Sequence, residues 1–321
     1  MKSPFYTEIF FIPVSAKNQR NFSCCIYQQE REMVLLYSIM NFLNFNGKLI
    51  DAATPVIGAD NRGLRFGDGL FETFKYVNNE LLLFDEHIAR LFKGMNSLQI
   101  EIPKHFTPLK IHEQVIQLVN KNRQKKARIR LTIVRGNGGL YDAENNNPIY
   151  LIQSWELPDA NGMLNVNGLQ LCIYNEARKM ADHFSNLKHN NYLPYFMRAL
   201  EAKKNKCNDA IILNNHGRVC DSTIANIFII RDGAVFTPAL TEGCIAGIMR
   251  KFILQKLRDS GFPITETSIS TDDLLQADEV FLSNSIYNIR WVAGIDNISY
   301  TNTITTGIIL KLQQTNPDIF C

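Results

Sequence analysis

The sequence predicts a two-domain α/β (α+β) protein. Its 321 residues are enough for two cores, and 45% hydrophobic with 20% charged residues is ordinary for a globular chain. Segments with strand alternation and segments with helical periodicity interleave from Phe42 onward. The stretch Pro158-Asp-Ala-Asn-Gly162 is the best candidate linker. We therefore expect a smaller N-terminal domain over 40–160 and a larger C-terminal domain over 161–321.

Residues 1–39 show no sustained period, and we expect an arm that is disordered or that lies upstream of the native start. The net charge of +3 is too small to indicate a nucleic acid or a membrane surface as a partner. The seven cysteines include no C-x-x-C pair, and the six histidines include no H-x-x-x-H pair. We expect reduced thiols in a cytoplasmic protein, without a metal site.

The first domain contains a glycine-rich segment, 61–69, which we expect to form a loop. An alternating segment over 70–76 leads into Asn78-Asn79, which predicts a hairpin turn. Asp85 can cap the helix that follows, and a second helix is expected over 109–122.

The predicted strand Ala127–Arg135 has two different faces. Alternation places Arg128, Arg130 and Thr132 on one face and aliphatic side chains on the other. A charge such as Arg130 in the middle of a strand is unusual unless its face lines a cavity or carries a salt bridge. The pattern leaves both interpretations open.

The second domain continues with a strand over 169–174, a loop that holds Lys188, and a helix that begins near Pro194. The period of that helix predicts that Leu193, Phe196, Met197 and Leu200 point inward. A strand meander over 210–237, a helix over 246–260, a strand over 280–285 and a closing helix over 303–315 complete the chain.

Lys188, Arg90 and Asp221 are the candidates for chemistry. A lysine that is kept neutral by burial or nearby positive charge can form a Schiff base with an aldehyde. Arg90 lies off the apolar stripe of its helix, and the helix start at Ala246 presents free N–H groups that suit an anion. Each of these features is also found on ordinary solvated surfaces, so composition and spacing alone do not assign a reaction.

Six short motifs, in order from about Phe42 to Leu312, resemble the class IV aminotransferase family, the fold type IV pyridoxal phosphate (PLP) enzymes. The resemblance implies a C-terminal pseudo-barrel domain, PLP as the cofactor, a small amino substrate and a homodimer. The motifs are Arg65-Phe-Gly-Asp-Gly-Leu-Phe-Glu-Thr73, His87-Ile-Ala-Arg-Leu91, Lys188-His-Asn-Asn191, Val219–Phe228, Gly247-Ile-Met-Arg250 and Phe281-Leu-Ser-Asn-Ser285.

The resemblance also implies roles for single residues. Lys188 would form the Schiff base and move the proton at the substrate's α-carbon. Arg90 would bind the cofactor phosphate together with Ser285 and the N–H groups of Ile248 and Met249. The remaining implied contacts are Asn226 to the cofactor, and Phe71, Lys75 and Arg130 to the substrate.

Asp221 departs from the family pattern, because the family usually carries glutamate there as the partner of the ring nitrogen. Aspartate is one methylene shorter, so the ring must move, the strand must lean in, or a water must bridge the gap. The negative charge that keeps the ring nitrogen protonated is retained.

The motifs look most like the 4-amino-4-deoxychorismate lyase branch, which eliminates pyruvate to give 4-aminobenzoate for folate synthesis. The spacing of Lys188 to Asn191 and the segment Asn284-Ser285-Ile286 are similar to that branch, in which Thr73 would relay a proton. Leu140 stands where a basic residue is common in the lyase and D-amino-acid branches, and Arg130 could serve instead. The alternative is a branched-chain or D-amino-acid aminotransferase that uses 2-oxoglutarate, and a third reading is a binding protein that kept the fold.

Overall fold

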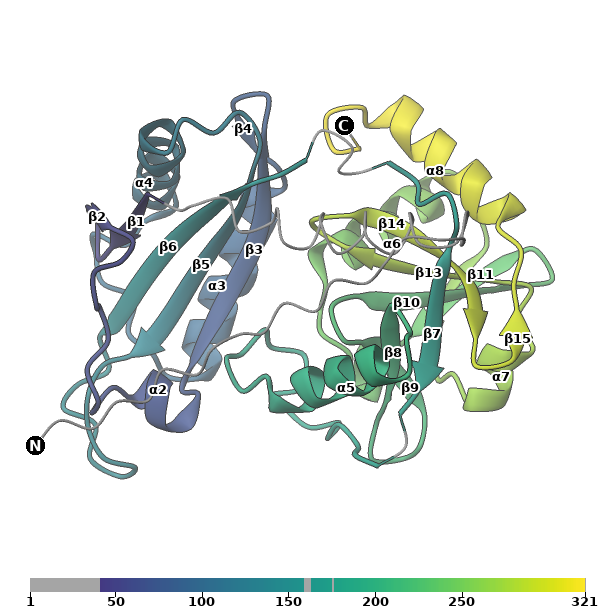
Figure 1. The fold of residues 1–321 in the computed structure, drawn as a ribbon, viewed down its shortest axis with the longest axis horizontal. Coiled ribbons are helices and arrows are strands. Elements are labelled where there is room, and N and C mark those ends of the chain that lie inside the picture. Colours follow the sequence, from purple (N-terminus) through teal and green to yellow (C-terminus); the bar gives the residue numbers. More distant parts are fainter. Residues whose placement is uncertain (1–40, 159–162, 175, 321) are drawn as a thin grey trace, which may run out of the picture. The chain divides into compact units, whose positions relative to one another are not determined.

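Two β-sheets organise the part of the chain that the structure describes (Figure 1). The structure is a computed structural model, and it describes residues 41–158, 163–174 and 176–320. The predicted arm 1–39 and the predicted linker, apart from Pro158, lie outside the described residues. The linker falls between the last strand of the first sheet and the first strand of the second.

The first sheet, as far as the chain is described, has the strand order β2-β1-β6-β5-β3-β4, and its neighbouring strands are antiparallel. The hairpin turn between β3 and β4 is confirmed, because Asn78 and Asn79 have positive φ angles of 53° and 65°, as a type I′ turn requires. The strands are β1 (Phe42–Phe45), β2 (Lys48–Asp51), β3 (Gly69–Val77), β4 (Glu80–Leu81), β5 (Ala127–Arg135) and β6 (Pro148–Glu156).

Helices α3 (Phe84–Ser97) and α4 (Pro108–Lys121) share one apolar core with the first sheet. The predicted helix over 109–122 is confirmed to within one residue. The predicted alternation of β5 is also confirmed, since Ile129, Leu131 and Ile133 are fully buried in this core. The opposite face of β3 and β5 therefore remains available for other contacts.

Two local predictions in this half were wrong. The cap of α3 is Leu83, in the left-handed conformation, and Asp85 lies within the first turn, where its charge still favours the helix dipole. The expected loop over 61–69 contains a short helix, α2 (Arg62–Phe66), which the Asn61 side chain caps. This helix buries no residue, so hydrophobic periodicity could not indicate it.

The second sheet is mixed. Among the described residues its order is β12-β11-β10-β13-β14-β7-β8-β9, with β15 added beside β14. Strand β9 at one end of this order also packs against β10 and β11, so the sheet curls. The strands are β7 (Leu169–Ile173), β8 (Asp209–Leu213), β9 (Val219–Ser222), β10 (Asn226–Arg231), β11 (Ala234–Pro238), β12 (Ile264–Thr267), β13 (Glu279–Asn284), β14 (Asn288–Ile295) and β15 (Ile298–Ser299).

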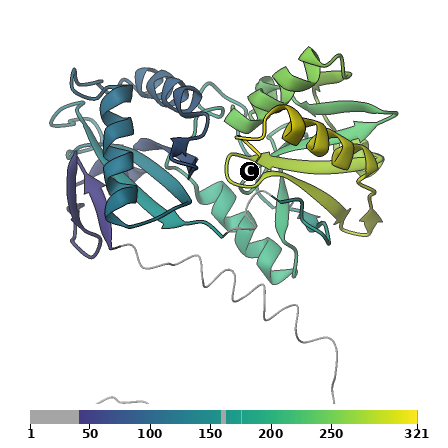
Figure 2. The same ribbon diagram turned by 90° about the horizontal axis from the view of Figure 1, so that it is seen from above.

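Helices α6 (Ile248–Asp259) and α8 (Thr303–Thr315) cover one face of this sheet (Figure 2). Their apolar side chains pack on Phe228 and Phe281, whose rings stack at 4.7 Å between centroids. The closing helix is confirmed to the residue, and α6 begins two residues later than expected. Two shorter helical segments in this half are α7 (Thr271–Leu275) and a 3₁₀ turn, Leu240–Glu242. None of the described helices has the length and hydropathy that crossing a bilayer requires.

Helix α5 (Leu193–Lys204) contradicts the prediction about its faces. Its buried residues are Tyr195, Arg198 and Ala202, so the polar-looking side of the helix faces the protein. The side chains that were expected to point inward are exposed by 43–63%: Leu193, Phe196, Met197 and Leu200. The helical period identified correctly which apolar side chains share a face, but these side chains remain exposed in the part of the chain that the structure describes.

Candidate active site

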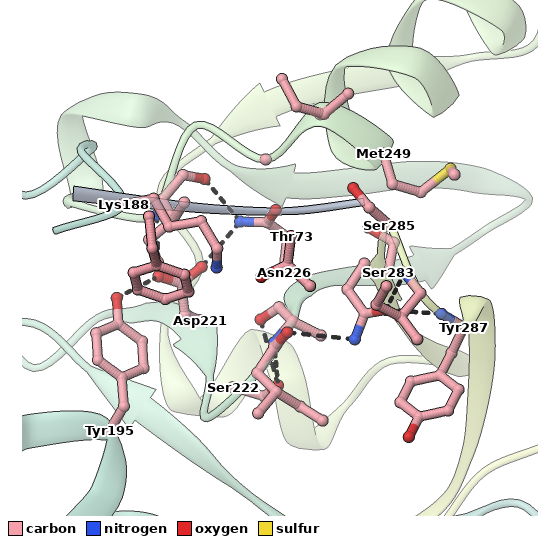
Figure 3. Close-up of a pocket in the computed structure, with 18 of the residues that line it drawn as sticks. Thr73, Lys188, Tyr195, Asp221, Ser222, Asn226, Met249, Ser283, Ser285 and Tyr287 are labelled. Atoms are coloured by element: carbon pink, nitrogen blue, oxygen red, sulfur yellow. Dashed lines mark hydrogen bonds between the residues drawn. The ribbon is translucent and has the colours of Figure 1, made fainter. Parts of the chain in front are cut away.

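A cavity of about 260 Å³ collects most of the residues that the sequence singled out (Figure 3). Its walls come from the free face of β3 and β5, the loop before α5, β9, the start of α6 and the end of β13. Predicted site residues that line it are Phe71, Thr73, Arg90, Arg130, Lys188, Asp221, Asn226, Ile248, Met249 and Ser285.

Lys188 is held against β3 by backbone hydrogen bonds. Its carbonyl accepts from Phe71 N–H at 2.9 Å, and Asn190 N–H donates to the Gly69 carbonyl at 2.9 Å. A side chain at Gly69 would begin only 2.1 Å from the Ile133 carbonyl, so this close approach requires glycine. The loop thus behaves as an extra strand that fixes the lysine backbone at the cavity.

The Lys188 amine is chemically prepared for nucleophilic attack. Its Nζ lies 4.5 Å from the centre of the Phe71 ring. Burial, followed by the positive charges of Arg90 and Arg130, lowers its pKa to about 7. A large fraction of this amine is therefore neutral near neutral pH, which is the form that attacks an aldehyde.

Arg90 is oriented by a buried carboxylate. Its Nε and Nη2 donate to the two oxygens of Glu72 at 2.8 and 2.6 Å, and its Nη1 donates to the Ala246 carbonyl at 2.8 Å. A guanidinium has five N–H donors, so one N–H on each terminal nitrogen remains for a ligand. Two such donors side by side match the oxygens of a phosphate.

Glu72 and His87 form the support beneath Arg90, and sequence reasoning did not assign either one. Burial opposes the charge of Glu72, but Arg90 and the His87 hydrogen bond outweigh it and lower the pKa of the carboxyl to about 2. His87 Nδ1 lies 2.7 Å from Glu72 Oε2, and burial lowers the pKa of the imidazole. The available signal was alternation, which puts Glu72 on the core face of β3, where a charge needs a partner.

The start of α6 offers the second part of an anion site. Gly247 is its N-cap and provides no side-chain bond, so the first N–H groups of this 12-residue helix face outward without a side-chain cap. The Ala246 carbonyl bonds to Arg90, which brings the guanidinium beside this helix start. Ser285 follows β13 and lines the same cavity.

Ser283 adds a polar group that the sequence reasoning missed. Its hydroxyl lines the cavity, is buried, and has no hydrogen-bond partner among the described residues. A buried hydroxyl without a partner costs free energy, so a ligand with a polar atom at this wall would satisfy it.

Asp221 lies deep in the cavity wall and is 1% exposed. Its Oδ1 accepts from Asn226 Nδ2 at 2.9 Å. Its Oδ2 accepts from Lys179 Nζ at 3.2 Å, Tyr195 OH at 3.1 Å and Ile245 N–H at 3.0 Å. Burial raises the pKa of this carboxyl, and Lys179 acts against that rise. Neither Lys179 nor Tyr195 was assigned a role from the sequence.

Arg130 crosses the free face of the first sheet. Its guanidinium lies 3.8 Å from the centre of the Phe71 ring, and its Nε donates to Thr132 Oγ1 at 3.1 Å. No carboxylate of the described residues forms an ion pair with it, so the salt-bridge interpretation has no support. Arg128 lines the cavity next to it and stacks on Trp155 at 4.5 Å. Two cations on one wall suit a substrate with carboxylates.

Lys75 is not brought to the cavity. It is on the same face of β3 as Phe71 and Thr73, but its Nζ donates to Asn288 Oδ1 at 2.9 Å and to the Ile319 carbonyl at 3.2 Å. These bonds tie the first sheet to β14 and the C-terminal segment. The predicted substrate contact at Lys75 therefore gains no support, and Leu140, which is 58% exposed, is also absent from the lining.

The lining matches the three reactive parts of PLP. The spare N–H groups of Arg90, the start of α6 and Ser285 fit a phosphate, and the half-neutral amine of Lys188 fits an aldehyde. Asp221 fits a protonated ring nitrogen, because its Oδ1 has accepted only one hydrogen bond. The polar groups of this lining therefore fit one ligand of this kind.

Comparison with known proteins gives a consistent result. The model of the family "Amino-transferase class IV" matches residues 69–295. The chain is 28% identical over 277 residues to a putative branched-chain-amino-acid aminotransferase of Methanocaldococcus jannaschii, covering 85% of this chain and 94% of that protein. It is 29% identical over 237 residues to the aminodeoxychorismate lyase of Vibrio harveyi, covering 73% and 86%.

A solved structure agrees with these matches. The branched-chain aminotransferase from Thermoproteus uzoniensis with norvaline superimposes with a TM-score of 0.77 at 25% identity, covering 87% of this chain and 94% of that one. The family is PLP-dependent and consists of enzymes such as these lyases and aminotransferases. The family match, the fold and the cavity agree, and the chain belongs to the class IV aminotransferase family.

Proposed function

We propose that this protein is a PLP-dependent lyase that eliminates pyruvate from 4-amino-4-deoxychorismate and leaves 4-aminobenzoate. The observation that carries the PLP chemistry is the half-buried Lys188, whose amine has a pKa of about 7, in one cavity with Arg90 and Asp221. PLP, when bound, draws electrons away from the substrate's α-carbon. The protein's own residues then bind, orient and move protons.

Each cavity residue has one task in this proposal. Lys188 would hold the cofactor aldehyde and then take the proton from the α-carbon. Arg90, Ser285 and the N–H groups of α6 hold the phosphate, and Asn226 keeps Asp221 in place. Loss of the α-proton would let the C–O bond to the neighbouring enolpyruvyl group break, and the ring would become aromatic. Thr73 lines the cavity, and its hydroxyl could pass a proton to the departing enolpyruvate, which then becomes pyruvate.

Arg130 and Arg128 favour a substrate with carboxylates, and 4-amino-4-deoxychorismate carries them. The same wall favours a second candidate, transamination with 2-oxoglutarate by a branched-chain or D-amino-acid aminotransferase. Both kinds of protein are among the relatives that match this chain. Lys188 would move the same proton in either reaction, so the products distinguish the two.

The test has two stages. Purified protein should show a visible cofactor band that borohydride removes, with the reduced label on Lys188 by peptide mass spectrometry; Lys188→Ala should show no label. Incubation with 4-amino-4-deoxychorismate should then release pyruvate, whereas incubation with amino acids and 2-oxoglutarate should not yield glutamate. Glutamate without pyruvate would replace the lyase by the aminotransferase, and a colourless protein that takes no label would exclude both.

We further propose a homodimer. The exposed stripe of α5 defines one continuous apolar surface at Leu193, Phe196, Met197 and Leu200, with exposed fractions of 43–63%. A second copy of the chain is the partner that would cover this stripe in every molecule. The stripe begins one residue after Tyr192, which lines the cavity, so the partner would lie close to the candidate active site.

A further inference from the structure

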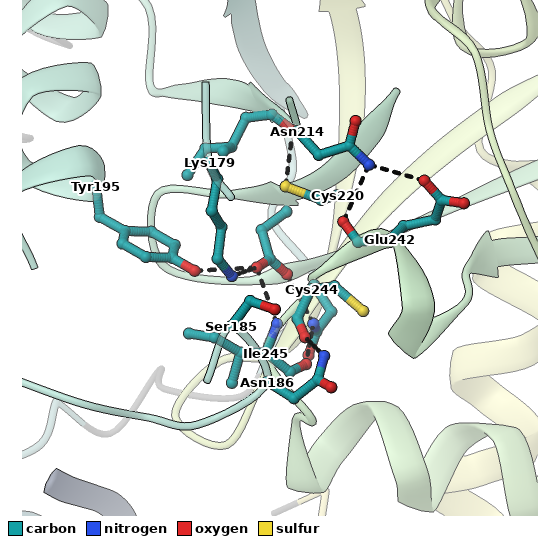
Figure 4. Close-up of polar contacts among 12 residues, drawn as sticks. Lys179, Ser185, Asn186, Tyr195, Asn214, Cys220, Glu242, Cys244 and Ile245 are labelled. Carbon is teal, nitrogen blue, oxygen red and sulfur yellow. Dashed lines mark hydrogen bonds and ion pairs between the residues drawn. The ribbon is translucent and has the colours of Figure 1, made fainter. Parts of the chain in front are cut away.

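Lys179 is a buried lysine that the proposed chemistry does not use (Figure 4). Its side chain is 7% exposed and forms an ion pair with Asp221, whose side chain is 2% exposed. Its backbone N–H donates to the Leu213 carbonyl at 3.0 Å, which fixes it beside β8. It is not one of the residues that line the cavity, so it approaches Asp221 from the protein side.

The two oxygens of Asp221 are used unequally. Oδ2 accepts three hydrogen bonds, from Lys179, Tyr195 and Ile245, whereas Oδ1 accepts one, from Asn226. Removing Lys179 would still leave two donors on Oδ2. Several hydrogen bonds therefore fix the position of the carboxylate, but Lys179 is the one charged group among its four partners.

The other titratable groups near Asp221 do not duplicate that charge. Burial raises the pKa of the Tyr195 phenol and of the Cys220 and Cys244 thiols, which keeps these three groups neutral. The Lys188 amine is about half neutral near pH 7, and it would be bonded to the PLP aldehyde in the loaded protein, so it does not supply a second fixed positive charge. The groups concerned are Lys188, Tyr192, Tyr195, Cys220 and Cys244.

We propose that the positive charge of Lys179 partly neutralises Asp221. A bound PLP ring nitrogen would then face a carboxylate that already has an ion-pair partner, and it would hold its proton less tightly than beside an unpaired carboxylate. An anion within about 4–6 Å typically raises the pKa of a neighbouring base by about 1–3 units, and a cation on its far side opposes this. The inference rests on the proposed function, because it concerns the residue that faces the cofactor ring.

The test reads the ring nitrogen directly. Apoprotein is loaded with PLP that is ¹⁵N-labelled in the ring, and the nitrogen shift is followed by NMR from about pH 6 to about pH 10, a range that brackets neutral pH. The wild type should titrate within this range. In Lys179→Met, which removes charge and donor, and in Lys179→Gln, which removes only the charge, the midpoint should rise by about 1–3 units.

Two further variants control the result. Lys179→Arg keeps the charge and should restore the wild-type midpoint. Lys203→Met removes a charge from the exposed side of α5 and should leave the midpoint unchanged. If Lys179→Met does not fold, the wild-type titration and Lys179→Gln still decide the question.

The outcomes separate this inference from the function on which it rests. A wild-type protein that takes no PLP overturns both. A protein that binds PLP at Lys188 but whose nitrogen is fully protonated throughout the range overturns only the role of Lys179. Equal midpoints in wild type, Lys179→Met and Lys179→Gln overturn it as well, and the lyase or aminotransferase proposal then stands without it.

Discussion

At the Lys188 amine, burial and two arginines act in the same direction and lower the pKa from 10.5 to about 7. The unfolded chain therefore binds more protons at this residue than the folded chain between these two values. Stability contributed by this site is lowest below about pH 7 and rises as the pH approaches about 10.5. The reactive amine is thus maintained at a cost to the fold.

We expect Lys188→Met to stabilise the apoprotein at pH 7 by up to about 4 kcal/mol, from ~1.4 kcal/mol per pKa unit. The gain should shrink as the pH rises toward 10.5, where both states of the wild type lose the proton. Urea unfolding at several pH values measures it, with Lys203→Met as the control. A gain in stability that is independent of pH would contradict the lowered pKa of the Lys188 amine.

Glu72 should affect phosphate binding through Arg90, whose Nε and Nη2 donate to its two oxygens. Replacing Glu72 by glutamine removes the negative charge that orients the Arg90 guanidinium. Hydrogen bonds to charged groups are typically worth about 1.5–3 kcal/mol. We expect Glu72→Gln to weaken PLP binding about 10- to 100-fold in a fluorescence titration of apoprotein. Glu266→Gln, which removes the partner of Arg250 and Arg258, should bind PLP normally. Equal affinities in both variants would remove the positioning role of Glu72.

Sequence motifs predicted the residues that face the ligand, but they did not predict the residues that bond to those side chains and fix their positions. Lys188, Arg90 and Asp221 belong to motifs, and the structure brings all three to one cavity. Lys179 and Tyr195 reach Asp221 from segments 42 and 26 residues away, and nothing in their local pattern indicates that meeting. Lys75 shows the converse limit, because alternation places it on the same strand face as Phe71 and Thr73, but its amine bonds to Asn288 and the predicted substrate contact gains no support.

At the scale of elements, the start of α6 depends on a close approach to β10. A Cβ at Gly247 would lie 1.9 Å from Asn226 Oδ1, which is too close for either group to remain. Asn226 bonds to both Asp221 and the Ile245 carbonyl, so a shift there moves the ring-nitrogen partner and the helix start together.

We expect Gly247→Ala to lower stability by about 1–3 kcal/mol and to weaken PLP binding at least about tenfold. Gly307→Ala is the matched control, because Gly307 lies in α8 with nothing within 4 Å of the added carbon. This control should be neutral or stabilising by up to about 1 kcal/mol. Thermal unfolding and PLP titration test both variants, and normal PLP binding by Gly247→Ala would show that the contact is not needed.

The apolar stripe of α5 shows what periodicity can and cannot predict. The 3.6-residue repeat identifies which side chains share a face, but it does not identify what covers that face. Tyr195 and Arg198 are buried because hydrogen bonds reach them, to Asp221 and to the Pro194 and Ala177 carbonyls. A pattern based on hydrophobicity assigns such residues to solvent.

We expect a Phe196→Asp, Leu200→Asp double variant to be a monomer where the wild type forms the proposed dimer, because two charges would be buried at the contact. Light scattering during gel filtration gives the mass directly. Leu310→Asp on α8 is the control, since Leu310 is 53% exposed and apolar but lies outside this stripe. A wild-type protein that elutes as a monomer, or a double variant that remains a dimer, would contradict the proposal.

At the scale of the whole molecule, residues of both sheets line one cavity, so a bound cofactor would contact both. A ligand that binds only the folded state stabilises it by about 2.7 kcal/mol when present at about 100 times its Kd. We expect PLP to raise the melting temperature of the apoprotein in one cooperative transition. Pyridoxal, which lacks the phosphate, should give a much smaller shift, and equal shifts would argue against the anion site.

The succession of strands and helices could be predicted because most elements bury one side. The closing helix and α4 follow from period alone, and the Asn78-Asn79 turn follows from residues that accept positive φ. Element order does not determine how β7 comes to lie between β14 and β8, because those pairings join distant segments. The interleaved periodicities predicted the α/β class, and the family resemblance supplied the fold type and its pseudo-barrel domain.

Strand β5 has a consequence for how this protein can diversify. Its fully buried positions, Ile129, Leu131 and Ile133, hold the first sheet to its helices, while Arg128 and Arg130, which alternate with them, face the cavity. Every second residue of this strand can therefore be substituted under selection for a new substrate, while the residues between them keep the sheet packed on its helices. Relatives with different reactions can arise from such a strand without passing through an unfolded ancestor.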